Sequence, residues 1–250
     1  MSHHRRRRNA TRESARDGKC GGLVLFDLDH TLLNGDSDAL WCEFLMDKGL
    51  LPREQFTPRN QDMVTRYKAG TVGVQEFADF YVGTLAGKGP RDWEPLRQEF
   101  LAAHVVPRIP QSALDLVDRH IDACDLVVMT TATNRFITEL TAMYFGIEHL
   151  LATEAEVVQG LFSGRTQGTL NMRDGKVERL KAWLRARSHS LHSLRTTAYS
   201  DSINDLALLE AVKHPVAVDP DPQLAAIARK RSWPVLHLHV PAGARLAGRP

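Results

Sequence analysis

The segment Phe26-Asp27-Leu28-Asp29-His30-Thr31-Leu32 decides the fold. It includes the end of the apolar run Leu23-Val24-Leu25-Phe26, which has the length and continuity of a strand buried on both faces. Asp27 and Asp29 are two residues apart, so strand geometry points their side chains to the same side. In open α/β sheets, ligands bind at the carboxyl ends of the strands. The segment therefore predicts two carboxylates that converge at this edge.

Two converging carboxylates repel one another unless a cation or a shared proton relieves them. A hard Mg²⁺ ion, which prefers oxygen ligands, would neutralise the pair and hold a phosphate beside it. Alternatively, one carboxyl group keeps its proton and serves as a general acid. An Asp-x-Asp pair alone is equally compatible with a helix N-cap and an ordinary loop aspartate. The remaining chain has to decide between these interpretations.

Polar side chains that suit phosphate chemistry recur at three later points. An apolar run at residues 126–129 ends in Thr130-Thr131-Ala132-Thr133-Asn134, which could form either an anion cradle or a helix cap. Lys176 stands near the start of a predicted helix, where it is either aimed at the sheet edge or solvated. A third strand is expected to end in Tyr199-Ser200-Asp201-Ser202-Ile203-Asn204-Asp205. Asp201 and Asp205 would add two carboxylates to the same edge.

The order of the predicted elements favours an α/β fold with an inserted helical domain. Apolar spacing is helical from residue 37 to 123, whereas strands and single helices alternate from 125 to 238, with a hairpin near Gly160. Such alternation indicates a parallel sheet covered by helices on both faces. We therefore divide the chain in this way: a basic disordered tail at 1–20, an α/β core at 21–35 and 124–240, a helical cap at 36–123, and a tail at 241–250.

The strand ends thus carry Asp/Asp, Thr, Lys and Asp/Asp in chain order. This combination resembles the haloacid dehalogenase (HAD) superfamily of phosphohydrolases, whose motifs are Asp-x-Asp-x-Thr, a Ser/Thr after an apolar strand, a Lys, and Gly-Asp-x-x-x-Asp. The resemblance covers residues 23–218, with Ser200 in place of the usual glycine. Thr131 fits the second motif best, and Thr130 is the alternative. The helical insert is similar to the cap of subfamily IB, the phosphoserine-phosphatase-like branch.

The resemblance implies a Rossmann-like three-layer core and a Mg²⁺-dependent phosphomonoesterase that forms an aspartyl-phosphate. Asp27 would be the nucleophile, and Asp29 would protonate the leaving alcohol and later deprotonate water. The implied metal site uses Asp27, the main-chain carbonyl of Asp29 and Asp201, with Asp205 steadying either a metal-bound water or Lys176. The phosphoryl group would be held by Thr131, Ala132 and Lys176.

The substrate implied by the resemblance is a small ester that bears an amine. Asp36 stands at the spacing from Asp27 at which this branch places an acidic residue facing the substrate amine. A helix N-cap formed with Ser37 is an equal alternative. Phosphoserine and histidinol phosphate are the favoured examples, and a phosphotransferase of the same family is the near alternative. Candidates for the pocket lining within the insert are Trp41, Arg53, Arg59, Arg66 and Tyr67.

Other function classes fit the sequence less well. A receiver-like signalling module also uses Asp, Thr and Lys, but it places its accepting Asp on a later strand and lacks a helical insert. The first twenty residues carry a net charge of +5, yet no interleaved aromatics or recognisable nucleic-acid module accompany them. The arginines of this segment are followed by polar residues and not by the apolar stretch of an export signal, so we do not predict export.

Composition sets the remaining limits. Three scattered cysteines support neither a disulfide framework nor a zinc site. No apolar run approaches the ~20 residues that cross a bilayer. We therefore expect a cytoplasmic enzyme whose partner is a small phosphorylated metabolite, without a membrane or nucleic-acid partner. The sequence makes no prediction of the oligomeric state.

Overall fold

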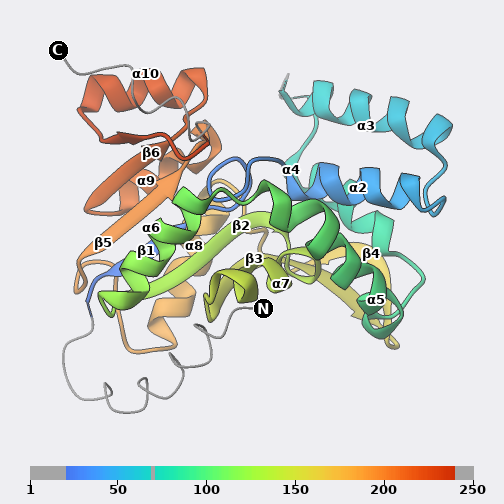
Figure 1. Ribbon diagram of the computed structural model, residues 1–250, viewed down its shortest axis with the longest axis horizontal. Helices are drawn as coiled ribbons and strands as arrows, with labels where there is room; N and C mark the ends of the chain where they lie inside the picture. Colours follow the sequence, from blue (N-terminus) through green and yellow to red (C-terminus); the bar gives the residue numbers. More distant parts are fainter. Residues whose placement is uncertain (1–20, 69–70, 240–250) are drawn as a thin grey trace.

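The computed structural model describes residues 21–68 and 71–239, so both predicted tails lie outside the described residues. The described chain forms a seven-stranded sheet in the order β4-β3-β2-β1-β5-β6-β7 (Figure 1). Neighbouring strands are parallel except for β4, which runs antiparallel to β3 as the predicted hairpin. The predicted α/β class with a parallel sheet is confirmed.

The elements follow the predicted alternation. The strands are β1 (Leu23–Phe26), β2 (Leu126–Asn134), β3 (His149–Val158), β4 (Leu161–Gln167), β5 (Thr196–Ser200), β6 (His214–Val218) and β7 (Val235–Leu236). The helices after the insert are α7 (Arg135–Phe145), α8 (Asp174–Arg185), the short η5 (Ile203–Asp205), α9 (Leu206–Ala211) and α10 (Pro222–Arg231). Within the insert lie α2 (Ser37–Asp47), α3 (Arg53–Lys68), α4 (Val74–Val82), η2 (Gly83–Leu85), α5 (Pro90–Phe100), η3 (Leu101–Val105), η4 (Val106–Arg108) and α6 (Gln111–Asp122).

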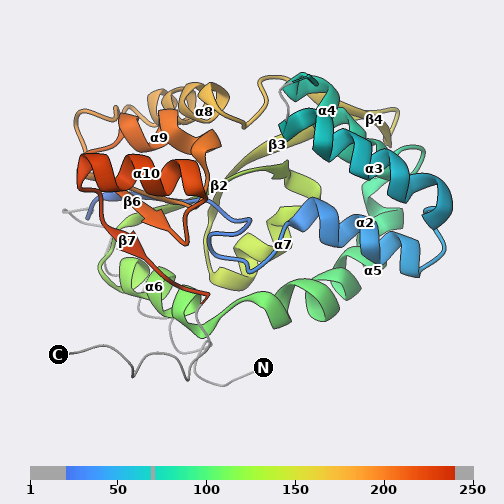
Figure 2. The ribbon, with the colours of Figure 1, turned by 90° about the horizontal axis from the view of Figure 1, so that it is seen from above.

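Strand β1 is buried on both faces, as its continuous apolar sequence predicts. Val24 and Phe26 pack into the hydrophobic cluster that includes α6 and α7. Leu23 and Leu25 pack into the cluster that includes α8, α9 and α10. Figure 2 shows these two helical layers on opposite sides of the sheet. The sheet is therefore the middle layer of a three-layer core.

The predicted insert divides into two parts by what it contacts. Helices α2 to α5 lie beyond the carboxyl end of the sheet, and α4 is tied to the hairpin strand β4 (Figure 1). In this contact, the backbone N–H of Thr166 in β4 donates to the side chain of Asp79 in α4 at 2.7 Å. Helix α6 packs instead on β2 and α7, so it contributes to a layer of the core. The part of the insert that stands over the strand ends is thus α2 to α5.

Strand β2 extends further than its apolar run predicts. Thr131 pairs with Ala152 and Asn134 pairs with Thr153, with a shift in register between the two pairs. A bulge of this kind changes the direction of the side chains that it contains. It therefore places the polar residues between Thr131 and Asn134 on the strand end itself, beside the end of β1.

Candidate active site

The candidate site lies where the strand order reverses. The chain adds β2 and β3 on one side of β1 and then crosses to add β5 and β6 on the other. Loops after β1 and β5 therefore leave the sheet side by side, which is where α/β sheets bind ligands. A cavity of about 490 Å³ opens there. Its lining contains every predicted site residue except Thr131, namely Asp27, Asp29, Asp36, Ala132, Lys176, Asp201 and Asp205.

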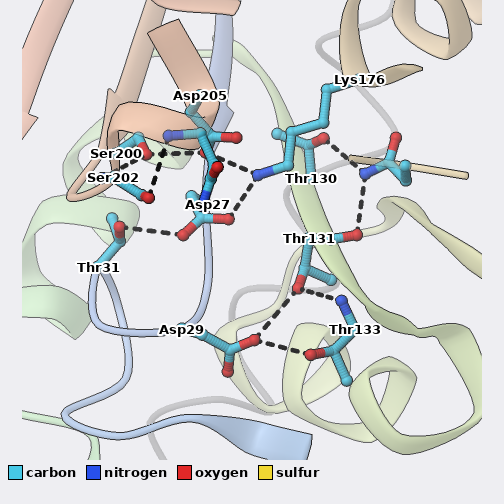
Figure 3. Close-up of polar contacts among 12 residues, drawn as sticks. Asp27, Asp29, Thr31, Thr130, Thr131, Thr133, Lys176, Ser200, Ser202 and Asp205 are labelled. Carbon is cyan, nitrogen blue, oxygen red and sulfur yellow. Dashed lines mark hydrogen bonds and ion pairs between the residues drawn. The ribbon is translucent and has the colours of Figure 1, made fainter. Parts of the chain in front are cut away.

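Lys176 is the buried cation of the site. Its Nζ lies 2.7 Å from Asp27 Oδ1 and 2.7 Å from Asp205 Oδ2 (Figure 3). Burial disfavours the ammonium, but attraction to Asp205 and Asp27 outweighs this effect and raises the pKa of Lys176. Ser200, which stands where the family usually has glycine, donates its hydroxyl to Asp205 at 2.7 Å. Of the two predicted roles of Asp205, these contacts favour support of Lys176.

Thr31 joins the two carboxylates that flank the strand reversal. Its Oγ1 lies 3.2 Å from Asp27 Oδ2 and 3.0 Å from Asp201 Oδ1, and it accepts the backbone N–H of Asp201. A single hydroxyl proton cannot be donated fully to both carboxylates. Burial raises the pKa of Asp27 to about 7 against the opposing effect of Lys176. Burial and the charge of Asp27 raise the pKa of Asp201 to about 8.

These two acids fit a magnesium site. Burial and the neighbouring carboxylates raise the pKa of both Asp27 and Asp201, so a bound cation would favour their ionised forms. Within residues 21–68 and 71–239, no three His, Cys, Asp or Glu side chains form a group that could hold a metal ion alone. The predicted site needs only two carboxylates together with the main-chain carbonyl of Asp29. Hard oxygen donors of this kind suit Mg²⁺.

Asp29 occupies a separate hydrogen-bonded niche. Its carboxylate accepts from the backbone N–H and the hydroxyl of Ser37, from Thr133 Oγ1 at 2.8 Å and from Thr131 Oγ1 at 3.4 Å (Figure 3). Burial and the nearby charge of Asp36 raise the pKa of Asp29 to about 6, against the opposing bonds from Ser37 and Thr133. A carboxyl group with this pKa can both release and accept a proton near neutral pH.

The two candidate threonines of the second motif face different surroundings. Thr131 Oγ1 faces Asp29, whereas Thr130 Oγ1 accepts from Asn171 Nδ2 at 3.0 Å (Figure 3). Asn171 is fully buried, and its Nδ2 also lies 2.9 Å from the carbonyl oxygen of Thr131. Neither threonine caps α7, because Asn134 is the N-cap residue. Of the two threonines, Thr131 is the one whose hydroxyl faces a carboxylate of the site, and its role in phosphate binding stays a prediction.

Asp36 is the N-cap of α2, as one of the two predictions for it states, and it also lines the cavity. Its Oδ1 accepts the backbone N–H of Ala39 at 2.8 Å. Helices α3 and α4 contribute aromatic, amide and aliphatic side chains to the cavity wall, namely Asn60, Val64, Tyr67, Phe77 and Tyr81. The rings of Tyr67 and Phe77 stack with centroids 4.0 Å apart.

Of the predicted pocket-lining residues, Tyr67 alone reaches this cavity. Trp41 is buried in the hydrophobic core beside Phe44 and Phe100. Three arginines have other contacts: Arg53 pairs with Glu43 and Asp47, Arg66 pairs with Asp62 and Glu76, and Arg59 lies over the ring of Phe80. Their positive charges are therefore directed away from the cavity.

Several site residues escaped the sequence reasoning. Thr133 was predicted only as part of a segment that forms an anion cradle or a helix cap, and Asp38 was not singled out, although both line the cavity. Burial and the charges of Asp36 and Asp29 raise the pKa of Asp38. Thr31 could have been found, because it stands four residues after Asp27 in the quoted motif. No local signal identifies Asn171, whose partners lie on β2 and β3.

Comparison with known proteins identifies the family. A model of the haloacid dehalogenase-like hydrolases matches residues 24–210. The chain belongs to this family. A histidinol-phosphatase from Neisseria meningitidis serogroup C is 36% identical over 86% of this chain and 98% of its own length. The phosphoserine phosphatase SerB1 from Mycobacterium tuberculosis is 29% identical over 91% of this chain and 74% of its own length.

Solved structures agree with this assignment. A Bordetella pertussis Tohama I protein of unknown function is 40% identical, with a TM-score of 0.85 over 88% of this chain and 100% of its own. A substrate-bound phosphoserine phosphatase has a TM-score of 0.61 over 88% of this chain and 94% of its own, and at 15% identity it supports the fold alone.

The HAD hydrolase is therefore an enzyme with the predicted fold class. The receiver-like alternative is wrong, because the hydrolase family model spans the insert as well as the strand ends. None of the described helices is long and apolar enough to span a membrane.

Proposed function

We propose that this hydrolase is a Mg²⁺-dependent phosphomonoesterase that forms an aspartyl-phosphate at Asp27. The observation that carries the proposal is the position of Asp27 between a cation and a second carboxylate. Lys176 lies 2.7 Å from one oxygen of Asp27, and Thr31 links the other oxygen to Asp201. A nucleophile flanked in this way has positive charge on one side and a metal-binding partner on the other.

The first chemical step transfers the phosphoryl group to the enzyme. A carboxylate oxygen of Asp27 attacks phosphorus, and the bond from phosphorus to the ester oxygen breaks. Asp29 in its protonated form donates its proton to the departing alkoxide, which leaves as an alcohol. Lys176 and the hydroxyl of Thr131 stabilise the charge on the phosphoryl oxygens, with the adjoining backbone at Ala132 completing the cradle.

The second step releases phosphate. Asp29, now a carboxylate, takes a proton from a water molecule whose oxygen attacks the phosphorus. The bond between phosphorus and Asp27 breaks, so the nucleophile is restored and inorganic phosphate departs. Asp27, Asp201 and the carbonyl of Asp29 would hold Mg²⁺, which would supply the positive charge that the phosphate and the two carboxylates need in one cavity. Helices α2 to α5 limit the access of bulk water to this chemistry.

The cavity supports a small, amine-bearing substrate. Asp36 places a carboxylate in the cavity lining, where the ammonium of a substrate would be favoured. The stacked rings of Tyr67 and Phe77 offer a flat apolar surface. Histidinol phosphate combines an amine with a flat ring, and the relative from Neisseria meningitidis is named a histidinol-phosphatase. We therefore rank histidinol phosphate ahead of phosphoserine, which carries a carboxylate.

A panel of phosphorylated metabolites, assayed with Mg²⁺ and with EDTA, tests the proposal. We expect Mg²⁺-dependent phosphate release, with histidinol phosphate among the best substrates. Asp27→Asn should abolish turnover while the circular dichroism spectrum stays that of the folded protein. Asp62→Asn, which alters an exposed carboxylate on α3, is the matched control and should retain activity. Wild-type activity in the Asp27→Asn variant would show that Asp27 is not the nucleophile.

The phosphotransferase alternative differs only in the acceptor of the second step. An alcohol would then replace water as the group that attacks the phosphorus of the aspartyl-phosphate. Addition of acceptor alcohols to the same assay distinguishes the two activities. A hydrolase releases phosphate at the rate at which the ester is consumed, whereas a transferase forms a new phosphate ester.

A further inference from the structure

A second turn supports the Asp201 loop from outside the cavity. Asp221 follows β6 and does not line the cavity. Its backbone N–H donates to the carbonyl oxygen of Asp201 at 2.8 Å. Its Oδ2 accepts the backbone N–H of Ile203 at 2.6 Å. Asp221 thus holds the main chain at both ends of the Asp201-Ser202-Ile203 turn.

The other oxygen of Asp221 has a different task. Oδ1 accepts the backbone N–H groups of Gln223 and Leu224, both at 2.8 Å, and so caps the N-terminus of α10. An aspartate in front of a helix commonly has this role alone. The bonds to Asp201 and Ile203 go beyond capping, because they connect the helix to a different loop. The Asp221 carboxylate therefore fixes the Ile203 end of the loop to α10, and the Asp221 backbone N–H holds the Asp201 end.

This connection opposes a specific repulsion. Asp201 Oδ1 and Asp27 Oδ2 both contact the hydroxyl of Thr31, so like charges face each other across one oxygen atom. Thr31 holds the Asp201 backbone from the cavity side, through its bond with the N–H of Asp201 at 3.0 Å. On the far side, the backbone N–H of Asp221 donates to the carbonyl oxygen of Asp201. With both anchors in place, Asp201 is kept near Asp27 before any cation arrives.

We propose that Asp221 is a positioning residue that holds Asp201 in place for Mg²⁺ and thereby sets the affinity of the site. The inference rests on the proposed function, because it takes Asp27 and Asp201 as the metal-binding pair. A site whose ligands are already in position binds its ion more tightly than one that must first be ordered. Removal of the outer anchor should therefore weaken Mg²⁺ binding without altering any group in the cavity.

The exchange Asp221→Asn separates positioning from capping. Asparagine caps a helix as well as aspartate does, so Oδ1 can still accept from Gln223 and Leu224. The amide NH₂ then replaces Oδ2 and faces the N–H of Ile203, where two donors meet without an acceptor. If the amide group were flipped, its oxygen would accept from Ile203, but the two capping bonds from Gln223 and Leu224 would be lost. Asp221→Ser is the second variant, since its single oxygen can cap the helix but supplies no second acceptor.

The test measures Mg²⁺ binding directly. Isothermal titration calorimetry and the Mg²⁺-induced rise in melting temperature are applied to the full chain, besides the Mg²⁺ dependence of activity. We expect both variants to raise the Kd for Mg²⁺ about tenfold, as the loss of a bond to a charged group predicts. Activity should recover at high Mg²⁺ concentration. In the absence of Mg²⁺, Asp221→Asn should remain folded, with a melting temperature lower by only a few degrees, because the capping bonds to Gln223 and Leu224 are kept.

Asp92→Asn is the matched control, because it changes an aspartate at the start of α5 whose carboxylate accepts the backbone N–H of Gly89 and does not line the cavity. It should bind Mg²⁺ with wild-type affinity. An unchanged Kd in Asp221→Asn and Asp221→Ser would overturn the inference and leave Asp221 as a helix cap. If the wild-type protein bound no Mg²⁺ at all, the proposed function would fail, and this inference would fail with it.

Discussion

The floor and the wall of the cavity are built on different principles. The floor comes from the strand ends of the core, where Asp27, Asp205 and Lys176 hold one another through bonds of 2.7 Å. The wall comes from α3 and α4, where rings stack and hydrogen bonds from Tyr81 to Asn60 at 2.9 Å and from Arg66 to Glu76 at 3.1 Å join the two helices. Directional bonds fix the position of a reacting phosphate, whereas ring surfaces adapt to the shape of a leaving group.

This difference assigns chemistry to the floor and selectivity to the wall. Under the proposed function, any phosphate ester would meet the same nucleophile, acid and cation at the floor. Only the group attached to the phosphate would then reach Tyr67, Phe77 and the carboxylate of Asp36, which line the cavity. Changes in the floor should therefore affect all substrates alike, and changes in the wall should alter the ratio between substrates.

The largest effect is expected at Lys176. Lys176→Met leaves the buried carboxylates of Asp27 and Asp205 without their cation. Breaking a buried pair by removal of one partner costs about 3–5 kcal/mol of the free energy of unfolding. Loss of a group that stabilises transition-state charge lowers kcat on the order of 10³-fold for every substrate. Urea denaturation and steady-state kinetics measure the two effects.

Lys181→Met is the control for this prediction, because Lys181 is an exposed residue of the same helix. It should leave both quantities unchanged. A Lys176→Met enzyme that kept its kcat would show that the floor does not depend on this cation.

An intermediate effect is expected at Asp36, at the border of the two regions. Asp36→Asn keeps an N-cap for α2 but removes a negative charge from the cavity. We expect the KM for histidinol phosphate to rise about tenfold, the factor that corresponds to about 1.4 kcal/mol, with little change in kcat. The KM for p-nitrophenyl phosphate, which has no amine, should not change. Asp47→Asn, at the far end of the same helix, is the control.

A smaller effect is expected in the wall. Tyr67→Leu removes a ring that stacks on Phe77 and lies under the guanidinium of Arg173. Aromatic contacts contribute about 0.5–1.5 kcal/mol, so the preference for ring-bearing over aliphatic esters should fall roughly threefold to tenfold. Tyr67→Phe keeps the ring and should preserve the preference. An equal loss of kcat/KM for all substrates would place Tyr67 in the chemical machinery instead.

The smallest effect is expected in the pH dependence of the stability of the Mg²⁺-free protein. Raised pKa values of about 6 for Asp29, 7 for Asp27 and 8 for Asp201 mean that the folded state binds more protons than the unfolded state. Stability is thus highest below the unfolded pKa and is lost as pH rises through about 6 to 8. The melting temperature without Mg²⁺ should fall by a few degrees between pH 5.5 and 8.

Mg²⁺ should reverse this trend, because it binds the ionised carboxylates of the folded protein. Its stabilising effect should therefore be greater at pH 8 than at pH 5.5. A metal-free protein that became more stable over this pH range would contradict the assigned origin of the raised pKa values.

Prediction from sequence succeeded where chemistry lies next to a strand signal. The run before Asp27 identified β1, and parallel strands necessarily bring their ends to one edge, so Lys176 and Asp201 could be placed near Asp27. The sequence did not predict residues whose role depends only on hydrogen bonds to segments that are distant in the chain. Asn171 holds the end of β2, and Asp221 holds the Asp201 turn, yet neither belongs to a local pattern.

The wall of the cavity shows the same limit more strongly. Helical spacing predicts that α3 and α4 are helices with an apolar side, but it does not tell which apolar residue faces the core and which faces a substrate. Tyr67 and Trp41 were equal candidates by sequence, and the packing of α2 against α5 buries Trp41 beside Trp93 and Phe100. Contacts between helices that are distant in sequence made this choice.

The sequence by itself determined the order of strands and helices and the residue types at the strand ends, because local periodicity and short motifs encode them. It also determined that Asp27 and Asp29 stand beside one strand. Only the tertiary structure decided that Thr131 and not Thr130 faces Asp29, and that Lys176 joins Asp27 to Asp205. Such pairings depend on register and side-chain direction across neighbouring strands, which no single segment of the chain specifies.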